Sequence, residues 1–189
     1  MQLHIKPLTP ETVEDFFTFF DKVAFADHPE WGCGCYCCMF HAPDAEAWAD
    51  NAPETNARLA REMILRGEMR GLLAYDGEKP VGWCHCDLVS NIPIVRTYYP
   101  EVASREDGVG AVVCFTIAQG YRGQGVATCL LEAAVDALRA QGAKAAEAYP
   151  MLTAQDDEHH YHGPLSLYEK AGFTLVREHE GMGLVRRAL

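Results

Sequence analysis

A buried strand that leads through glycines into an amphipathic helix is the feature that most constrains how this chain folds. The segment reads CFTIAQGYRGQGVATCLLEAA, residues 114–134. The apolar run at its start predicts a buried strand. Apolar residues at helical spacing after it predict a helix from about Gly123 to Gln141, ended by Gly142. A strand, a tight turn and a helix in this order are typical of a domain in which helices pack against a sheet.

The remaining apolar patterns extend this unit to one α+β (α/β) domain with a mixed sheet, covering residues 1–189. The hairpin at residues 70–89 is the clearest local signal, because two apolar runs flank the turn residues 76–80. Residues 90–110 contain Asn91, Pro93 and Pro100, and we expect a long irregular connection there. The other predicted strands lie at residues 3–8, 110–119 and 143–150 and as a pair within 173–187, and the other predicted helices lie at residues 9–25, 52–69 and 163–172.

The net charge and the cysteines narrow the expected partners and compartment. Twenty-seven acidic against sixteen basic residues give a formal net charge of −11. Nucleic acids and anionic membranes bind concentrated basic surfaces, so neither is an expected partner. The N-terminus lacks a basic region followed by an apolar stretch, and no apolar run approaches the roughly 18 to 20 residues of a membrane helix. Eight cysteines without an export signal are expected to be reduced thiols, which favours a cytoplasmic location.

The glycine turn is a candidate anion site. Gly123 and Gly125 let main-chain N–H groups approach a ligand, the helix N-terminus adds a positive dipole end, and Arg122 adds a fixed charge. A dinucleotide-binding Rossmann unit is one interpretation, with Glu147 near the end of the next strand. Against it, Thr128 occupies the third glycine position, and two helices and a hairpin precede the unit. A tight turn without a ligand is the other alternative.

Two sequence blocks resemble the GNAT superfamily of N-acetyltransferases. RGQGVA, residues 122–127, is similar to the family signature Q/R-x-x-G-x-G/A, and LSLYEKAGF, residues 165–173, is similar to the L-Y-E-K-x-G-F that closes these domains. The resemblance implies a mixed, mostly antiparallel sheet flanked by helices, whose central strands splay apart to bind acetyl-CoA. It is specific for about residues 70–189, the implied acetyl-CoA-binding part, and leaves residues 1–69 as a variable part on the acceptor side.

The resemblance also implies an activity and assigns residues to it. The activity is direct transfer of an acetyl group from acetyl-CoA to the amine of a small molecule, amino acid or peptide, by an enzyme that can be a homodimer. Tyr168 occupies the position of the tyrosine that commonly protonates the departing CoA thiolate; a buried core tyrosine is its alternative. The main chain of Phe115, Thr116 and Ile117 is expected to contact the pantetheine arm. The residues expected at the pyrophosphate are Arg122, Gly123, Gln124, Gly125, Val126 and Ala127.

The base that accepts the amine proton is not assigned, since many relatives use a chain of water molecules. Where an asparagine often stands seven residues before the tyrosine, this chain has Tyr161, which puts one CoA contact in doubt. The side chains that could face the cleft and act as base are Asp87, Glu101, Glu106, Glu147, His85 and His162.

The segment WGCGCYCCMFH, residues 31–41, raises the alternative of a metal site. A second pair of thiols, Cys84 and Cys86, shares one face of a predicted strand, with His85 on the other. A domain with this much core needs no metal to fold, and we expect none. His159, His160 and His162 are read as polar cleft or surface residues. The three ligands at workable spacing for zinc are Cys35, Cys38 and His41, with Cys33 or Cys37 as a possible fourth.

The same segment is also apolar and aromatic, which is how small-molecule pockets are lined. We therefore interpret it as a lid over the acceptor amine, with Trp31, Cys35 and Trp83 as candidate substrate contacts. A non-catalytic protein that senses acyl-CoA, metals or thiols is the alternative from a different functional class.

Overall fold

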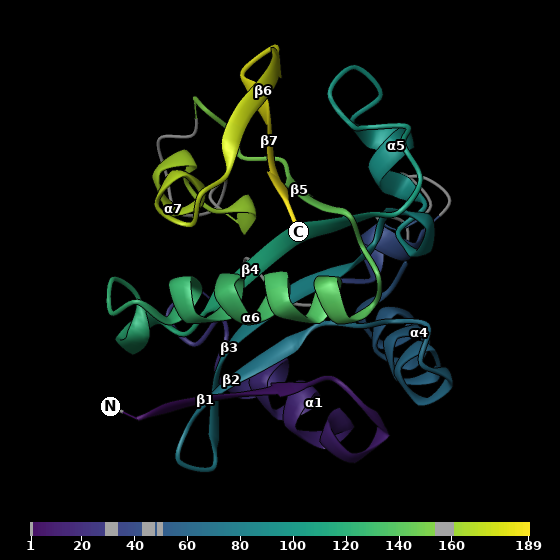
Figure 1. Cartoon of the computed structure of the whole chain (residues 1–189). Coiled ribbons are helices and arrows are strands. Elements are labelled where there is room, and N and C mark those ends of the chain that lie inside the picture. The colour runs from purple at the N-terminus through teal and green to yellow at the C-terminus, as the bar shows by residue number, and fades with distance from the viewer. Residues whose placement is uncertain (1, 29–33, 43–47, 49–50, 154–160) are drawn as a thin grey trace.

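Seven strands form one sheet, and helices cover both of its faces (Figure 1). The computed structural model describes residues 2–28, 34–42, 48, 51–153 and 161–189. The strand order is β1-β2-β3-β4-β5-β7-β6; β4 and β5 pair in parallel and the other neighbours are antiparallel. The predicted mixed, mostly antiparallel sheet is confirmed, and a Rossmann fold is excluded because it needs several parallel neighbours. The strands are β1 (Leu3–Pro7), β2 (Leu72–Asp76), β3 (Lys79–Leu88), β4 (Val109–Ile117), β5 (Ala145–Ala148), β6 (Thr174–His179) and β7 (Met182–Ala188).

Each face of the sheet has its own hydrophobic core. Helices α1 (Val13–Lys22) and α4 (Pro53–Arg66) belong to one core, which we call the aromatic core because rings such as Phe16, Phe20 and Trp83 pack within it. Helix α6 (Val126–Ala140) crosses the other face (Figure 1). Its buried apolar residues recur at helical spacing and pack against the strands. The short helices are α5 (Ile94–Tyr98) and α7 (Leu165–Lys170). None of the helices in the described ranges is both long and apolar enough to cross a lipid bilayer.

One predicted boundary was wrong, and one helix was not predicted. Helix α6 begins at Val126 and not at Gly123, because Gly123 and Gly125 have φ angles of +71° and +85°, which a right-handed helix does not accommodate. The connection at residues 90–110 is not wholly irregular, since it contains α5, and Tyr99 follows that helix directly.

The parallel strands β4 and β5 separate halfway along β4. Their pairing runs from Val109 to Val112 on β4, opposite residues 145–148. Strand β4 continues to Ile117, so from Val113 onward its edge has no pairing with β5. The predicted separation of the central strands is therefore present, and it leaves main-chain groups of β4 open to a ligand.

A β-bulge lies where this separation begins. His85 of β3 faces Cys114 of β4, whereas Cys86 faces Val112, so Val113 is left without a partner on β3. As a result Val113 and Cys114 both lie in the aromatic core, although neighbouring residues of a strand normally point to opposite faces. Phe115 then packs on the α6 side.

Candidate functional site

A cavity of about 520 Å³ is lined by β4 where that strand has left β5. Residues 114–117 of β4 form one wall. The glycine turn and α6 contribute Arg122 and Ala127, and the segment before α7 and α7 itself contribute Tyr161, Gly163, Pro164 and Leu167. The N-terminal part of the chain contributes Phe25, Cys35, Met39, Phe40 and Trp48. The cavity thus joins residues of the predicted acetyl-CoA part to residues of the predicted acceptor part.

The structure brings most of the predicted co-substrate residues to this cavity. Phe115, Thr116, Ile117, Arg122 and Ala127 line it. The turn residues Gly123, Gln124 and Gly125 are exposed beside them, whereas Val126 buries its side chain against the sheet and leaves only its main chain for a ligand.

The glycine turn leaves room for an anion at the start of α6. A side chain added at Gly120, Gly123 or Gly125 would meet no atom within 4 Å, so open space surrounds these three positions. Neither a side-chain cap nor an acidic residue occupies the first turn of α6. The first N–H groups of a helix have no partner inside the helix, and they favour a negatively charged ligand.

Arg122 is held between the turn and the N-terminal part of the chain. Its Nη1 lies 2.8 Å from Oδ2 of Asp27, and its Nε donates to the carbonyl oxygen of Ile117 at 3.1 Å. The Asp27 side chain is only 6% exposed. This ion pair ties the end of β4 to the segment that follows α1.

Tyr168 is fully buried and does not line the cavity. Its hydroxyl donates to the carbonyl oxygen of His162, and its ring packs against Phe115 and Phe173. Burial raises the pKa of Tyr168 well above its ordinary value. Gly163 lies between Tyr168 and the cavity, since a Cβ there would come within 3.4 Å of the tyrosine ring.

The three candidate substrate contacts have different outcomes. Cys35 lines the cavity. Trp83 does not, because its ring is fully buried against Phe16 and its Nε1–H donates to Cys37 Sγ at 3.1 Å. Trp31 lies outside the described residues.

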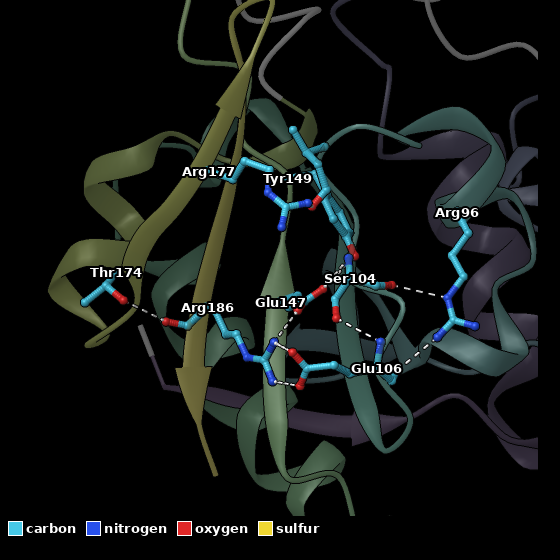
Figure 2. Close-up of polar contacts among 9 residues, drawn as sticks. Arg96, Ser104, Glu106, Glu147, Tyr149, Thr174, Arg177 and Arg186 are labelled. Carbon is cyan, nitrogen blue, oxygen red and sulfur yellow. Dashed lines mark hydrogen bonds and ion pairs between the residues drawn. The ribbon is translucent and has the colours of Figure 1, made fainter.

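Two of the candidate bases, Glu106 and Glu147, belong to a polar network beside β5 and β7 (Figure 2). Arg186 Nη1 lies 2.9 Å from Glu106 Oε1 and 3.2 Å from Glu147 Oε1. Glu147 Oε2 also accepts hydrogen bonds from the Tyr149 hydroxyl at 3.2 Å and the Ser104 N–H at 3.4 Å. Burial raises the pKa of Glu147, and Arg186 opposes this. The network anchors the loop after α5 to the sheet, and neither carboxylate lines the cavity.

Asp87, His85 and Glu101 also lie outside the cavity lining. The Asp87 carboxylate is buried and accepts a hydrogen bond from Asn91 at 3.1 Å. The Nε2 atoms of His85 and His41 lie 3.2 Å apart, with the two rings stacked. Glu101 is exposed at the surface.

His162 is buried behind the cavity wall. Its Nδ1 lies 2.7 Å from the carbonyl oxygen of Val113, and its Nε2 lies 2.8 Å from the Tyr99 hydroxyl. Its ring centroid is 4.1 Å from that of Tyr161, which lines the cavity. Burial lowers the pKa of His162 to about 4, opposed by the hydrogen bond to Val113, so the ring is neutral near pH 7.

The described residues do not assemble the alternative zinc site. Cys38 Sγ donates to the carbonyl oxygen of Asn56 at 3.2 Å, and His41 pairs with His85. Cys84 and Cys86 lie in the core on the face that α6 covers, opposite the face that holds Cys38. Within the described ranges, no group of three or more His, Cys, Asp or Glu side chains is placed to hold a metal ion. Cys33, His159 and His160 lie outside those ranges.

Comparison with known proteins agrees with this geometry. A family model described as the acetyltransferase (GNAT) family matches residues 30–173. No curated protein matches the sequence. The GNAT domain of PAT from S. lividans has a similar fold, with a TM-score of 0.62 and 20% identity over 99% of this chain and 90% of that chain. The PaiA N-acetyltransferase of Thermoplasma acidophilum in complex with coenzyme A also has a similar fold, with a TM-score of 0.60 and 12% identity over 100% of both chains. A phosphinothricin acetyltransferase of Sinorhizobium meliloti in complex with AcCoA has a TM-score of 0.60 and 16% identity over 100% of this chain and 89% of that chain.

Proposed function

Because this chain belongs to the GNAT family of acetyltransferases, we propose that it transfers the acetyl group of acetyl-CoA directly to the amine of a small molecule, an amino acid or a peptide. One observation carries the proposal. A single cavity is lined by the open edge of β4 and the glycine turn, which suit CoA, and by apolar side chains of the N-terminal part, which suit an acceptor.

The main chain around this cavity offers what a CoA molecule needs. The unpaired edge of β4 at Phe115–Ile117 can hydrogen-bond to the amides of a pantetheine arm, as an added strand would. The uncapped start of α6 and the open space at Gly123 and Gly125 suit a pyrophosphate, with Arg122 beside them. The CoA and AcCoA complexes of the structurally similar acetyltransferases support this assignment.

The acceptor side favours an amine with an apolar body. Met39, Phe40 and Trp48 line it together with Cys35, and we retain Cys35 as a proposed acceptor contact. Residues 1–69 would then select the acceptor while residues 70–189 bind the co-substrate. The described cysteines are free thiols, which supports a cytoplasmic enzyme.

Tyr168 is the proposed proton donor to the CoA thiolate, although its hydroxyl now donates to His162. As a general acid, Tyr168→Phe should lower kcat roughly 100-fold with little change in acetyl-CoA affinity. If Tyr168 only holds the His162 main chain, the variant should lose stability and keep most of its kcat. Tyr75→Phe is the matched control, because Tyr75 is equally buried and bonds to Asp15, outside the cavity lining.

The experiment that tests the function combines binding and turnover. Calorimetry should show binding of acetyl-CoA, and a CoA-release assay should identify acceptors among arylalkylamines, polyamines, amino acids and dipeptides. Absence of CoA binding would refute the acetyl-transfer proposal. Binding of acetyl-CoA without release of CoA in the presence of any tested amine would favour the non-catalytic sensor.

A further inference from the structure

We propose that Trp48 selects acceptors that carry a neutral carbonyl beside the amine, so that the preferred acceptor is an amino-acid amide or the apolar N-terminal residue of a peptide. The inference rests on the proposed function, because it names the class of acceptor for that reaction. Trp48 lines the cavity on the side formed by the N-terminal part of the chain, and its indole N–H is the group that would bind the carbonyl.

The indole N–H of Trp48 is a buried donor. No atom of the described residues accepts a hydrogen bond from its Nε1. Folded proteins rarely leave a buried donor unpaired, because such a donor has lost its hydrogen bonds to water. An indole N–H can only donate, so its partner must supply a lone pair. The oxygen of a carbonyl on the acceptor is such a partner.

Trp83 shows how the same kind of side chain is paired away from the cavity. Both tryptophans pack in or against the aromatic core, but Trp83 is fully buried and does not line the cavity. Its Nε1–H donates to Cys37 Sγ at 3.1 Å. Of these two described tryptophans, the unpaired one therefore lies in the cavity wall, where a ligand can supply the partner.

The side chains that share this side of the cavity are apolar. They include Phe25, Met39 and Phe40. They suit an apolar side chain on the acceptor, but they carry no donor for a carbonyl. A polar group that leaves water needs a new hydrogen-bond partner, and the Trp48 N–H supplies it. The acceptor therefore combines an apolar side chain with one hydrogen-bonding oxygen.

The charges around the cavity favour a neutral carbonyl over a carboxylate. Arg122 is the single cation among the described lining residues, and it is bonded to Asp27 at 2.8 Å and to the carbonyl oxygen of Ile117 at 3.1 Å. Burying a carboxylate without a free cation costs far more free energy than burying an amide. The net charge of −11 also repels anions. We therefore expect a free amino acid to be a poorer acceptor than its amide.

An amine beside a carbonyl also suits the chemistry. The nitrogen can attack the acetyl carbon only in its neutral form, and the described cavity lining contains neither a carboxylate nor an imidazole that could remove a proton. An α-amino group has a pKa of about 8, so about a tenth of it is neutral at pH 7. An alkylamine such as a lysine side chain has a pKa of about 10.4, so its neutral fraction is roughly 200-fold smaller. The amide therefore presents more reactive amine at the same concentration.

The test compares two acceptors that differ by one group. L-Phenylalaninamide is 2-phenylethylamine with a carboxamide on the carbon beside the amine. Trp48→Phe keeps an aromatic ring and removes the N–H. In the CoA-release assay this variant should lower kcat/KM for the amide roughly 10-fold, lower that for 2-phenylethylamine by less than about twofold, and leave acetyl-CoA affinity unchanged. Equal losses for both acceptors would overturn the proposal.

Trp83→Phe is the matched control, because it removes a buried indole N–H from the same core but outside the cavity lining. It should lower stability and keep the wild-type ratio of kcat/KM between the two acceptors. The same loss of preference in this variant would overturn the role of Trp48.

The wild-type enzyme provides a second test, which does not depend on the folding of a variant. It should use L-phenylalaninamide at least roughly 10-fold better than L-phenylalanine, as judged by kcat/KM. Equal use of the two compounds would overturn the preference for a neutral carbonyl.

A binding measurement follows the same hydrogen bond without turnover. The chain has three tryptophans, so nitrogen-15 NMR of the intact protein should show three indole N–H signals, and the one absent from Trp48→Phe belongs to Trp48. With CoA present, L-phenylalaninamide should move this signal and 2-phenylethylamine should not. No movement with the amide, or equal movement with both amines, would overturn the proposal. Wild-type protein that releases no CoA with any amine would instead refute the proposed function, so the two failures are distinct.

Discussion

The two faces of the sheet carry different kinds of side chains. The α6 face is packed mainly with small and aliphatic side chains, together with Phe115, Tyr168, Phe173 and the thiols of Cys84 and Cys86, and its glycine turn presents main-chain groups to the cavity. The opposite face carries the aromatic core, with rings, thiols and the buried histidines His85 and His162. A main-chain site can bind one invariant co-substrate with few constraints on side chains. A side-chain site has to be assembled from segments far apart in the sequence.

The strongest way to break the co-substrate side is to reverse one charge. Arg122→Glu would place a carboxylate beside the buried Asp27 and at the proposed pyrophosphate site. Charges about 4 Å apart near a protein surface interact by about 4 kcal/mol, so acetyl-CoA affinity should fall at least about 100-fold by calorimetry. Arg58→Glu is the control, because that side chain is 61% exposed on α4. Unchanged binding in Arg122→Glu would contradict the assigned pyrophosphate site.

Acid should lower the stability of the fold through the buried histidines of the aromatic core. Burial lowers the pKa of His41 and His162 to about 4 from an ordinary 6.5, so between these values the unfolded chain binds protons that the folded chain does not. Stability should therefore fall as the pH drops from 7 to 5, by about 2 kcal/mol for His162 alone. The raised pKa values of Asp87 and Glu147 act in the opposite direction.

Urea denaturation at both pH values measures this loss. His41→Gln should reduce it, and the control His179→Gln, at an exposed position, should not. A loss of stability in His41→Gln as large as that of the wild-type protein would contradict the burial of a neutral His41.

The smallest expected effect on acetyl-CoA binding is that of a substitution at Gly163, which lines the cavity. Gly163 and Gly172 have φ angles of +78° and +79°, so an alanine at either should cost about 1 kcal/mol of stability. At Gly172 the added Cβ meets nothing within 4 Å, whereas at Gly163 it lies 3.1 Å from Leu167. Gly163→Ala should therefore also weaken acetyl-CoA binding about fivefold, and Gly172→Ala should not. Equal affinities would show that this wall does not limit the co-substrate.

The sequence predicted the α6 side better than the aromatic side, for a physical reason. The strand, the glycine turn and the helix of residues 109–140 are contiguous, so local periodicity and the glycines of the turn were sufficient signals for their order, although the helix begins later than predicted. Tyr99 was missed because it follows a five-residue helix in a connection that predicted no structure. Its meeting with His162, 63 residues away, depends on the separation of β4 from β5.

One tryptophan was assigned to the pocket wrongly, and another was missed. Trp83 looked like a pocket residue, but strand β3 directs it into the aromatic core, where Phe16 and Phe20 cover it. Trp48, which lines the cavity, carried no signal in the sequence because no periodic pattern surrounds it. Packing of side chains from separate segments decides such positions, and spacing along one segment does not.

The bulge at Val113 adds one residue to β4 opposite β3, and this residue interrupts the regular alternation of side chains between the two faces of the sheet. Cys114 therefore faces the aromatic core, and Phe115 the α6 side, only because one extra residue precedes them. Substituting Val113 would alter one side chain, but deleting it would exchange the faces of the residues on one side of the bulge. In this strand the number of residues determines which side chains face the cavity. A one-residue deletion would therefore change the cavity wall more than any single substitution would.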